Sequence, residues 1–128
     1  MSREKGKRGE RELATLLSDL TGRSVTRRVR QHDGDSDLIG LEPWSSEVKL
    51  QKVLALDTWW EQTVEQSSVV SIAPWPVLFW RRHGTSVWWC RSRLCDVMAS
   101  MQIHCGDATP IDSKVTDWVV VVGLSAGK

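Results

Sequence analysis

Two short apolar runs in the first half of the chain carry residue types that could bind a divalent cation. Asp37 opens the run Leu38–Ile39, and Glu47-Val48-Lys49 follows ten residues after Asp37. Because alternate side chains of a strand share a face, Glu47 and Lys49 are expected to project together. If the two runs pair as neighbouring strands, Asp37 reaches the same patch. Two carboxylates beside an ammonium suit Mg²⁺ and a phosphodiester, since oxygen ligands hold the cation and a lysine can stabilise or deprotonate the attacking species.

The same residues also have a simpler interpretation. A Glu-x-Lys pair on a strand is often a solvated ion pair that contributes little to stability. A motif this short has a high false-positive rate and does not identify a site by itself. The rest of the chain must therefore decide between the two interpretations.

Charge is unevenly distributed along the chain. Residues 1–31 contain nine Lys or Arg and four acids, a net of +5, whereas the remainder contains eight bases and twelve acids, a net of −4. A basic arm on a weakly acidic body is typical of a nucleic-acid binder whose acids cluster at a metal site. A solvated basic tail is the alternative.

Length and cysteine content set the class. At 128 residues we expect one domain (1–128), with a basic arm over 1–12 and a tail over 124–128. With no apolar leader and no membrane-length apolar stretch, we expect a soluble cytoplasmic protein without a membrane partner. Three cysteines without a Cys-x-x-Cys pair indicate reduced thiols, and a zinc site from Cys90, Cys95, His104 and Cys105 fits no standard spacing.

Apolar periodicity predicts a helix over 3–20, where Leu13 and Leu17 recur at helical spacing and Gly22 marks the end. Glu10 lies one turn before Leu13, at the margin of this apolar stripe. A carboxylate directed towards the core is costly unless it is paired or binds metal. Alternatively, Glu10 and Glu12 are ordinary partners of neighbouring bases on an exposed helix start.

The remaining patterns predict the order αβββαββαβ, an α/β fold with a mixed central sheet flanked by helices. A half-buried strand with one basic face, a short strand opened by Asp37 and the Glu-x-Lys strand come before a crossover helix. A central apolar strand, its hairpin partner, a short helix and a last buried strand follow. After the first helix, the predicted ranges are 25–31, 37–41, 45–50, 58–66, 77–80, 86–91, 93–101 and 118–122.

The ordered set of Glu on a helix, Asp on a strand and Glu-x-Lys on the next strand resembles the core of the PD-(D/E)xK nuclease superfamily. The opening Lys5-Gly-Lys-Arg-Gly-Glu-Arg-Glu-Leu13 is similar to the start of archaeal-type Holliday junction resolvases. It is similar still more to small PD-(D/E)xK nucleases of phages and prophages, which share the Trp-Trp-x-Gln helix (here Trp59-Trp60-Glu61-Gln62) and an apolar strand ending in Arg-Arg. The resemblance is strong over residues 5–51 and weakens beyond residue 91.

This resemblance implies a restriction-endonuclease-like core and a Mg²⁺-dependent endonuclease in which Mn²⁺ can substitute. The expected substrate is branched DNA, with nicked, flapped or linear duplex DNA as open alternatives that the sequence does not separate. We expect a homodimer in the cytoplasm, that of the host if a phage encodes the chain. Glu10, Asp37 and Glu47 would be the metal ligands, Lys49 would stabilise the transition state, and Gln51 would orient a phosphate or a water. The cations expected to contact DNA are Lys5, Lys7, Arg8, Arg11, Arg27, Arg28, Arg30, Arg81 and Arg82.

One position departs from the family pattern, because Ser36 stands where the superfamily has Pro before the first Asp. Asp33 and Asp35 lie in the same turn, so the register is not unique, and Asp35 is the alternative to Asp37. Two other functions remain open: a catalytically silent DNA-binding module on this scaffold, and a protein-interaction domain suggested by the eight tryptophans.

Overall fold

The computed structural model describes residues 2–29, 36–69, 73–101 and 118–124. Within these ranges the elements follow the predicted order αβββαββαβ. Their bounds are α1 Ser2–Thr21, β1 Thr26–Arg27, β2 Leu38–Ile39, β3 Trp44–Gln51, α2 Leu56–Ser68, β4 Trp75–Arg82, β5 Trp88–Arg93, α3 Leu94–Ser100 and β6 Val119–Leu124. Arg30, Asp33, Asp35, His104 and Cys105 lie outside the described residues.

The main sheet has four strands in the order β3-β4-β5-β6. Strand β3 is parallel to β4, and the two remaining pairs are antiparallel, so the sheet is mixed as predicted. The crossover between the parallel strands is made by α2. Strands β1 and β2 form a separate antiparallel ribbon of two residues each, so the predicted three-strand start is not one continuous sheet.

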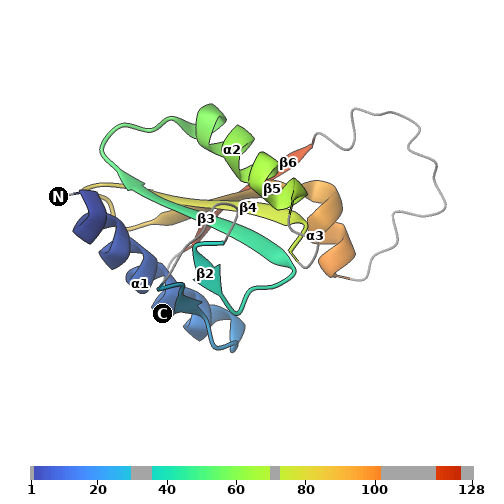
Figure 1. Ribbon diagram of the computed structural model, residues 1–128, viewed down its shortest axis with the longest axis horizontal. Coiled ribbons are helices and arrows are strands. Elements are labelled where there is room, and N and C mark those ends of the chain that lie inside the picture. The colour runs from blue at the N-terminus through green and yellow to red at the C-terminus, as the bar shows by residue number, and fades with distance from the viewer. Residues whose placement is uncertain (1, 30–35, 70–72, 102–117, 125–128) are drawn as a thin grey trace.

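The helices cover both faces of this sheet (Figure 1). Helix α1 runs along one face, and its buried leucines join a core that includes Leu50, Phe79 and Trp88 from the strands. Helix α2 crosses the opposite face over a smaller core of Trp59, Leu78 and Trp80. This arrangement confirms an α/β fold with a mixed four-stranded sheet flanked by helices.

Helix α1 forms and ends as its sequence predicts. Leu13 and Leu17 are 0% and 5% exposed, because their spacing puts both on the side that faces the sheet. The helix stops at Gly22, which adopts a φ of 72° and donates its N–H to the Ser18 carbonyl oxygen. Glycine adopts this left-handed conformation without the steric cost that other residues incur.

Two glycines allow close approaches that place the first elements. A Cβ at Gly9 would come within 3.1 Å of a Leu50 methyl carbon, so α1 lies close against β3 at this point. Gly40 has a φ of 102°, and a Cβ there would collide with the Ser24 carbonyl oxygen. Gly9 therefore lets α1 pack closely against β3, and Gly40 lets the end of β2 pass close to the backbone that precedes β1.

Two predictions about the later elements are wrong in detail. Helix α2 begins at Leu56 after Ala55, whose side chain makes no capping hydrogen bond, rather than at Thr58. Strand β6, expected to be buried, is an edge strand in which Val119, Val121 and Val122 are 37–51% exposed. Among the described helices, none has the length and apolar character needed to cross a membrane.

Candidate metal and phosphate site

Asp37 lies along the outer edge of β3 and is held there by hydrogen bonds on both sides. Its N–H donates to the Ser46 carbonyl oxygen at 3.0 Å, and its carbonyl oxygen accepts from the Arg28 N–H at 2.9 Å. Its carboxylate Oδ2 accepts from the Val48 N–H at 2.7 Å. Asp37 is therefore fixed directly beside the middle of the Glu-x-Lys motif, and it is only 8% exposed.

Glu47 and Lys49 project from the face of β3 that α2 covers. They lie opposite Leu78 and Trp80 of β4, which belong to the core under α2, whereas Leu50 points into the core under α1. The Lys49 Nζ is 3.5 Å from the Glu47 Oε1. Both side chains are largely buried, at 26% and 15% exposed, so this is not the solvated surface pair of the simpler interpretation.

Glu10 approaches the same edge from α1. It follows Gly9, where the helix touches β3, and its side chain is 14% exposed. The Glu10 Oε2 lies 3.1 Å from the Nε of Arg27 in β1, but the two atoms are buried without an aligned hydrogen bond. Because this oxygen lies close to the guanidinium without a well-aligned hydrogen bond, it can still accept from a further partner.

The three carboxylates affect one another electrostatically. Burial is the largest cause that raises the pKa of Glu10 to about 7, and the charge of Asp37 raises it further against the opposing Arg27. Burial likewise raises the pKa of Glu47 to about 7; the charges of Asp37 and Glu10 add to this rise, and Lys49 opposes it. A helix-borne and two sheet-edge carboxylates therefore form one coupled cluster.

The carboxylate oxygens suit a hard divalent cation that is bound by only a few protein ligands. Within the described ranges, no three His, Cys, Asp or Glu side chains are gathered tightly enough to hold a metal ion by themselves. Mg²⁺ does not require such a cage, because it keeps several waters and is commonly bound by one or two carboxylates together with substrate phosphates. Asp37 and Glu47 offer those carboxylates, and the charge of Asp37 raises the pKa of both glutamates, so a positive ion among them would relieve their mutual repulsion.

Gln51 shares a strand face with Glu47 and Lys49 by alternation, but it lies at the exposed end of β3. Its carbonyl oxygen accepts from the His83 N–H at 2.8 Å. The structure gives its side chain no contact with the three carboxylates. A direct role in the cluster is therefore not supported by the geometry, although the position is open to a bound phosphate.

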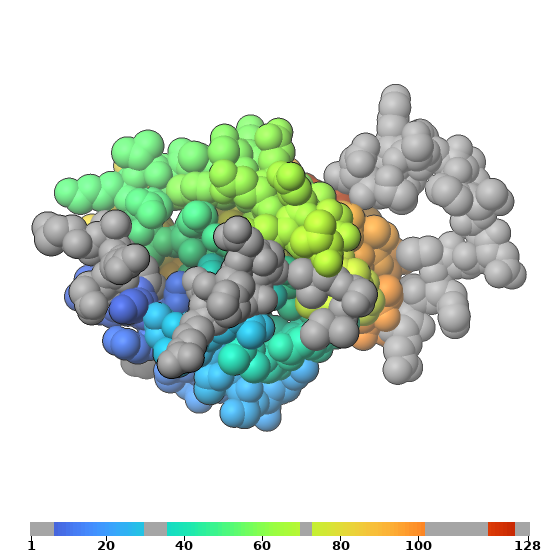
Figure 2. Space-filling model, in the orientation of Figure 1, coloured from blue at the N-terminus to red at the C-terminus, as the bar shows by residue number. Residues whose placement is uncertain are grey.

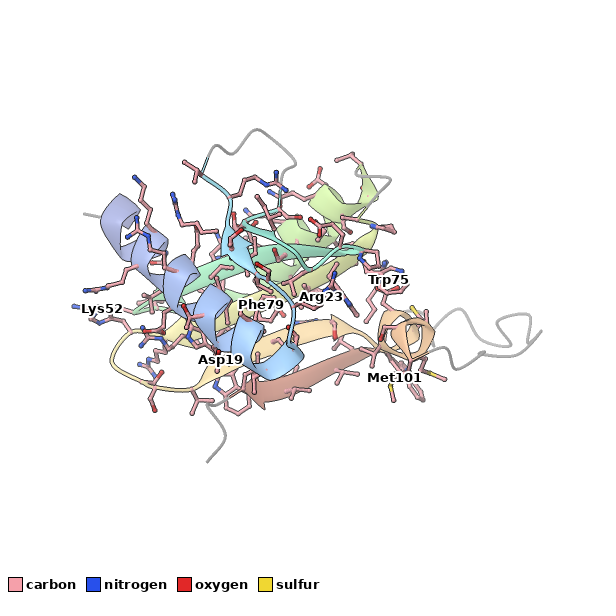
Figure 3. The ribbon with its side chains drawn as sticks, turned by 90° about the horizontal axis from the view of Figure 1, so that it is seen from below. Asp19, Arg23, Lys52, Trp75, Phe79 and Met101 are labelled. Carbon is pink, nitrogen blue, oxygen red and sulfur yellow. The ribbon has the colours of Figure 1, made fainter. Side chains whose placement is uncertain are left out.

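The predicted DNA-contacting cations fall into two groups. Arg8, Arg11 and Arg82 are exposed, as is Lys52, which the sequence patterns did not single out because it follows the motif in a loop. Figure 3 shows Lys52 near the nitrogen-bearing side chains of the N-terminal half of α1. The exposed group is thus concentrated at the end of the molecule where α1 begins and β3 ends.

The second group has protein partners. Besides Arg27, the Arg28 Nε donates to the Ser36 carbonyl oxygen at 2.8 Å. The Arg81 Nε is 2.9 Å from the Glu12 Oε2, and the same carboxylate oxygen accepts from the Trp88 Nε1–H at 2.7 Å. Glu12 therefore ties α1 to the sheet, a role for which no local sequence signal exists. The partly buried Lys7 also has an interaction. Lys5 lies near the start of α1, and its side chain is outside the described part of the structure.

The site occupies the β3 edge of the sheet, with α1 and the β1–β2 ribbon on one side and α2 on the other. Figure 2 shows these elements on one face of the molecule, α2 along one margin and α1 with the ribbon along the other. The chain matches no protein-family model, no curated protein and no solved structure. The function of this site is therefore inferred from its own residues.

Proposed function

We propose that this chain is a metal-dependent DNA endonuclease that hydrolyses phosphodiester bonds at branched structures. The observation that carries the proposal is the hydrogen bond from the Val48 N–H to the Asp37 carboxylate, which fixes this carboxylate beside the backbone of Val48, the middle residue of the Glu-x-Lys motif. Glu10 is electrostatically coupled to the same cluster from α1. The same carboxylates and ammonium, in this order along the chain, form the pattern that resembles the PD-(D/E)xK nucleases.

The proposed fold type is a restriction-endonuclease-like core. What supports it is the position of the site at the edge of a mixed sheet, with the Glu-x-Lys strand parallel to its neighbour through a helical crossover. The Asp-bearing segment also hydrogen-bonds to the Glu-x-Lys strand, so the two runs are neighbours. The proposed relatives are resolvase-like and phage nucleases.

The residues have distinct proposed roles. Asp37 and Glu47 would hold Mg²⁺ or Mn²⁺, and Glu10 adds negative charge beside them. When bound, such an ion polarises the scissile phosphate and lowers the pKa of a bound water. The Lys49 ammonium offsets the negative charge that develops on the phosphoryl oxygens, and it does so from a site where water is largely excluded. Burial of these groups strengthens each electrostatic contact.

The exposed cations would position the DNA. Within the described residues, Arg8, Lys52 and Arg82 have no ion pair like those of Arg27 and Arg81. They lie towards one end of the molecule together with Arg11, whose charge acts on Glu10. Contacts of this kind release counterions from the phosphate backbone, so binding should weaken steeply with salt. They give affinity without sequence readout, which suits an enzyme that recognises DNA shape.

The proposed second partner is another copy of this chain. Strand β6 forms one edge of the sheet, and its residues 118–124 contain neither a charged residue nor a proline. Monomeric proteins usually protect such an edge with charges, prolines or bulges. An uncharged strand can pair antiparallel with itself across a two-fold axis without repulsion, whereas the outer edge of β3 is already covered by residues 36–38.

The proposal is tested by incubating labelled four-way junction, flapped, nicked and linear duplex DNA with the wild type in Mg²⁺. We expect preferential junction cleavage, and a loss of roughly 100-fold or more in Glu47→Ala with DNA binding retained. Asp19→Ala, which removes an exposed acid from the far end of α1, is the matched control and should cut normally. Equal cutting of all substrates would reject the branched-DNA claim. Salt-sensitive binding without any cleavage in Mg²⁺ or Mn²⁺ would favour the silent DNA-binding module.

A further inference from the structure

Lys49 lies beside two tryptophans, one on β4 and one on α2. Its direct neighbour across the strand pair is Trp80 of β4, and its Nζ is 6.0 Å from the ring centroid of Trp59 in the first turns of α2. Trp59 is 9% exposed and packs with Trp80 and the fully buried Leu78. The indole of Trp59 is therefore held rigidly by its own core contacts, at the outer limit of the distance at which a ring face attracts a cation.

We infer that Trp59 is a positioning residue for Lys49, holding the ammonium where the proposed reaction requires it. The catalytic consequence rests on the proposed nuclease function, whereas the placement of the ammonium does not. A lysine has a long flexible stem and loses much conformational entropy when it is fixed. A side chain that must meet developing charge at a defined point therefore needs more than one contact to hold it.

The only ion pair that the structure gives Lys49 within the described residues is with Glu47, at 3.5 Å. In the proposed site Glu47 also binds a cation, which weakens its attraction for the ammonium. The indole of Trp59 does not bind the metal ion, so its contact with the Lys49 ammonium remains when Glu47 binds the cation.

The next residue provides a matched control within the same helix. Trp60 lies under a different cation, Arg91, at 4.8 Å from the ring centroid to the guanidinium carbon. Arg91 lies on β5 and is aligned with Glu47 across the sheet, because Leu78 of β4 is the register partner of both residues. The Arg91 Nη1 is 3.6 Å from the Asp57 Oδ1 of α2. Both tryptophans thus bind α2 to the sheet through a cation, but only Trp59 does so through Lys49.

The first test of this inference does not require activity. The ring current of Trp59 should shift the Lys49 ε-methylene proton resonances upfield from those of other lysines. In Trp59→Leu this shift should decrease to whatever part the neighbouring Trp80 contributes, and in Trp60→Leu it should remain unchanged. A Lys49 resonance that is the same in the wild type and in Trp59→Leu would overturn the inference. Melting by circular dichroism shows whether each variant is folded.

The second test is single-turnover cleavage of the four-way junction at saturating enzyme. We expect Trp59→Leu to lower the cleavage rate about 5- to 30-fold with an unchanged DNA dissociation constant. Trp59→Phe should recover most of the rate because it restores an aromatic face, and Trp60→Leu should stay within about twofold of the wild type. Equal losses in Trp59→Leu and Trp60→Leu would reduce Trp59 to a core residue and overturn the inference. A wild type that keeps the resonance shift but cuts no DNA would instead reject the nuclease function.

Discussion

Glu10 and Glu47 lie in surroundings that oppose their ionisation, since burial and neighbouring carboxylates raise the pKa of each to about 7. An acid with a raised pKa binds more protons in the folded state than in the unfolded state. Its contribution to stability is therefore fully present below its ordinary pKa and is lost as the pH rises through about 7. The carboxylate cluster is thus a source of instability at neutral pH, which a bound cation can remove.

This linkage predicts the pH dependence of the melting temperature in metal-free buffer. Between pH 5 and pH 8 the free energy of unfolding of the wild type should fall by on the order of 1–3 kcal/mol more than that of Glu47→Gln, which lacks one of the two groups. This corresponds to several degrees in melting temperature. Mg²⁺ should stabilise the wild type more at pH 8 than at pH 6. Asp19→Asn, on the exposed end of α1, should follow the wild-type profile. Parallel profiles for the wild type and Glu47→Gln would contradict the coupling.

The sequence could indicate Glu10, Asp37, Glu47 and Lys49 because each has a local signature, either a strand motif or a position on a helical wheel. It could not indicate Arg27 as the ion-pair partner of Glu10, because that contact joins α1 to the β1–β2 ribbon. The contact between Trp59 and Lys49 was hidden for the same reason. Contacts of this kind depend on how elements pack, which no short window of residues contains.

At the scale of elements, the site depends on how closely α1 approaches β3. Gly9 makes that approach possible, since a Cβ there would come within 3.2 Å of the Leu50 Cβ as well as a Leu50 methyl carbon. Glu10 follows immediately, so the helix position sets where this carboxylate lies. The lack of a side chain at Gly9 therefore helps to set the position of Glu10 in the carboxylate cluster.

We expect Gly9→Val to destabilise the protein by about 1–3 kcal/mol through overpacking against β3. If the variant remains folded, it should also cut junction DNA at least tenfold more slowly, because Glu10 is displaced from the cluster. Thermal melting and single-turnover cleavage measure the two effects. Asp19→Val, at an exposed position of the same helix, is the control for placing a β-branched residue in α1. Wild-type stability and activity in Gly9→Val would show that the close packing has no role.

The element order could be read from the sequence because apolar periodicity reports which faces are buried. The start of α2 could not, because Leu56 packs partly buried against the core and the helix therefore begins before Thr58. The exposure of β6 was also missed, since four consecutive valines suit a buried strand as well as an edge. Only the strand order of the sheet distinguishes these two cases.

At the scale of the whole molecule, the two edges of the sheet differ in character. The β3 edge carries charge and the candidate site, whereas the β6 edge is uncharged, with Val121 51% exposed. If two copies pair through β6, the two sites lie at opposite ends of one continuous sheet. With neighbouring strands about 4.8 Å apart, eight strands would separate the sites by roughly 35 Å, a spacing suited to two cuts on one branched substrate.

The predicted dimer is tested by light scattering coupled to size-exclusion chromatography. The wild type should elute as a dimer at micromolar concentration, and Val121→Lys should shift it to a monomer while the fold is retained. Thr85→Lys, which adds the same charge to the exposed β4–β5 turn, is the control and should leave the dimer intact. A monomeric wild type would indicate that the β6 edge is covered by another part of the chain or by a different partner.

The most direct measurement for the whole account is single-turnover cleavage of a four-way junction in Mg²⁺ by the wild type and by Asp37→Asn. The substitution keeps the shape of the side chain that accepts from the Val48 N–H and removes the charge that couples Glu10 to Glu47. We expect cleavage to fall by roughly 100-fold or more with the junction still bound. Cleavage by Asp37→Asn at the wild-type rate would contradict the assignment of this cluster as the catalytic site.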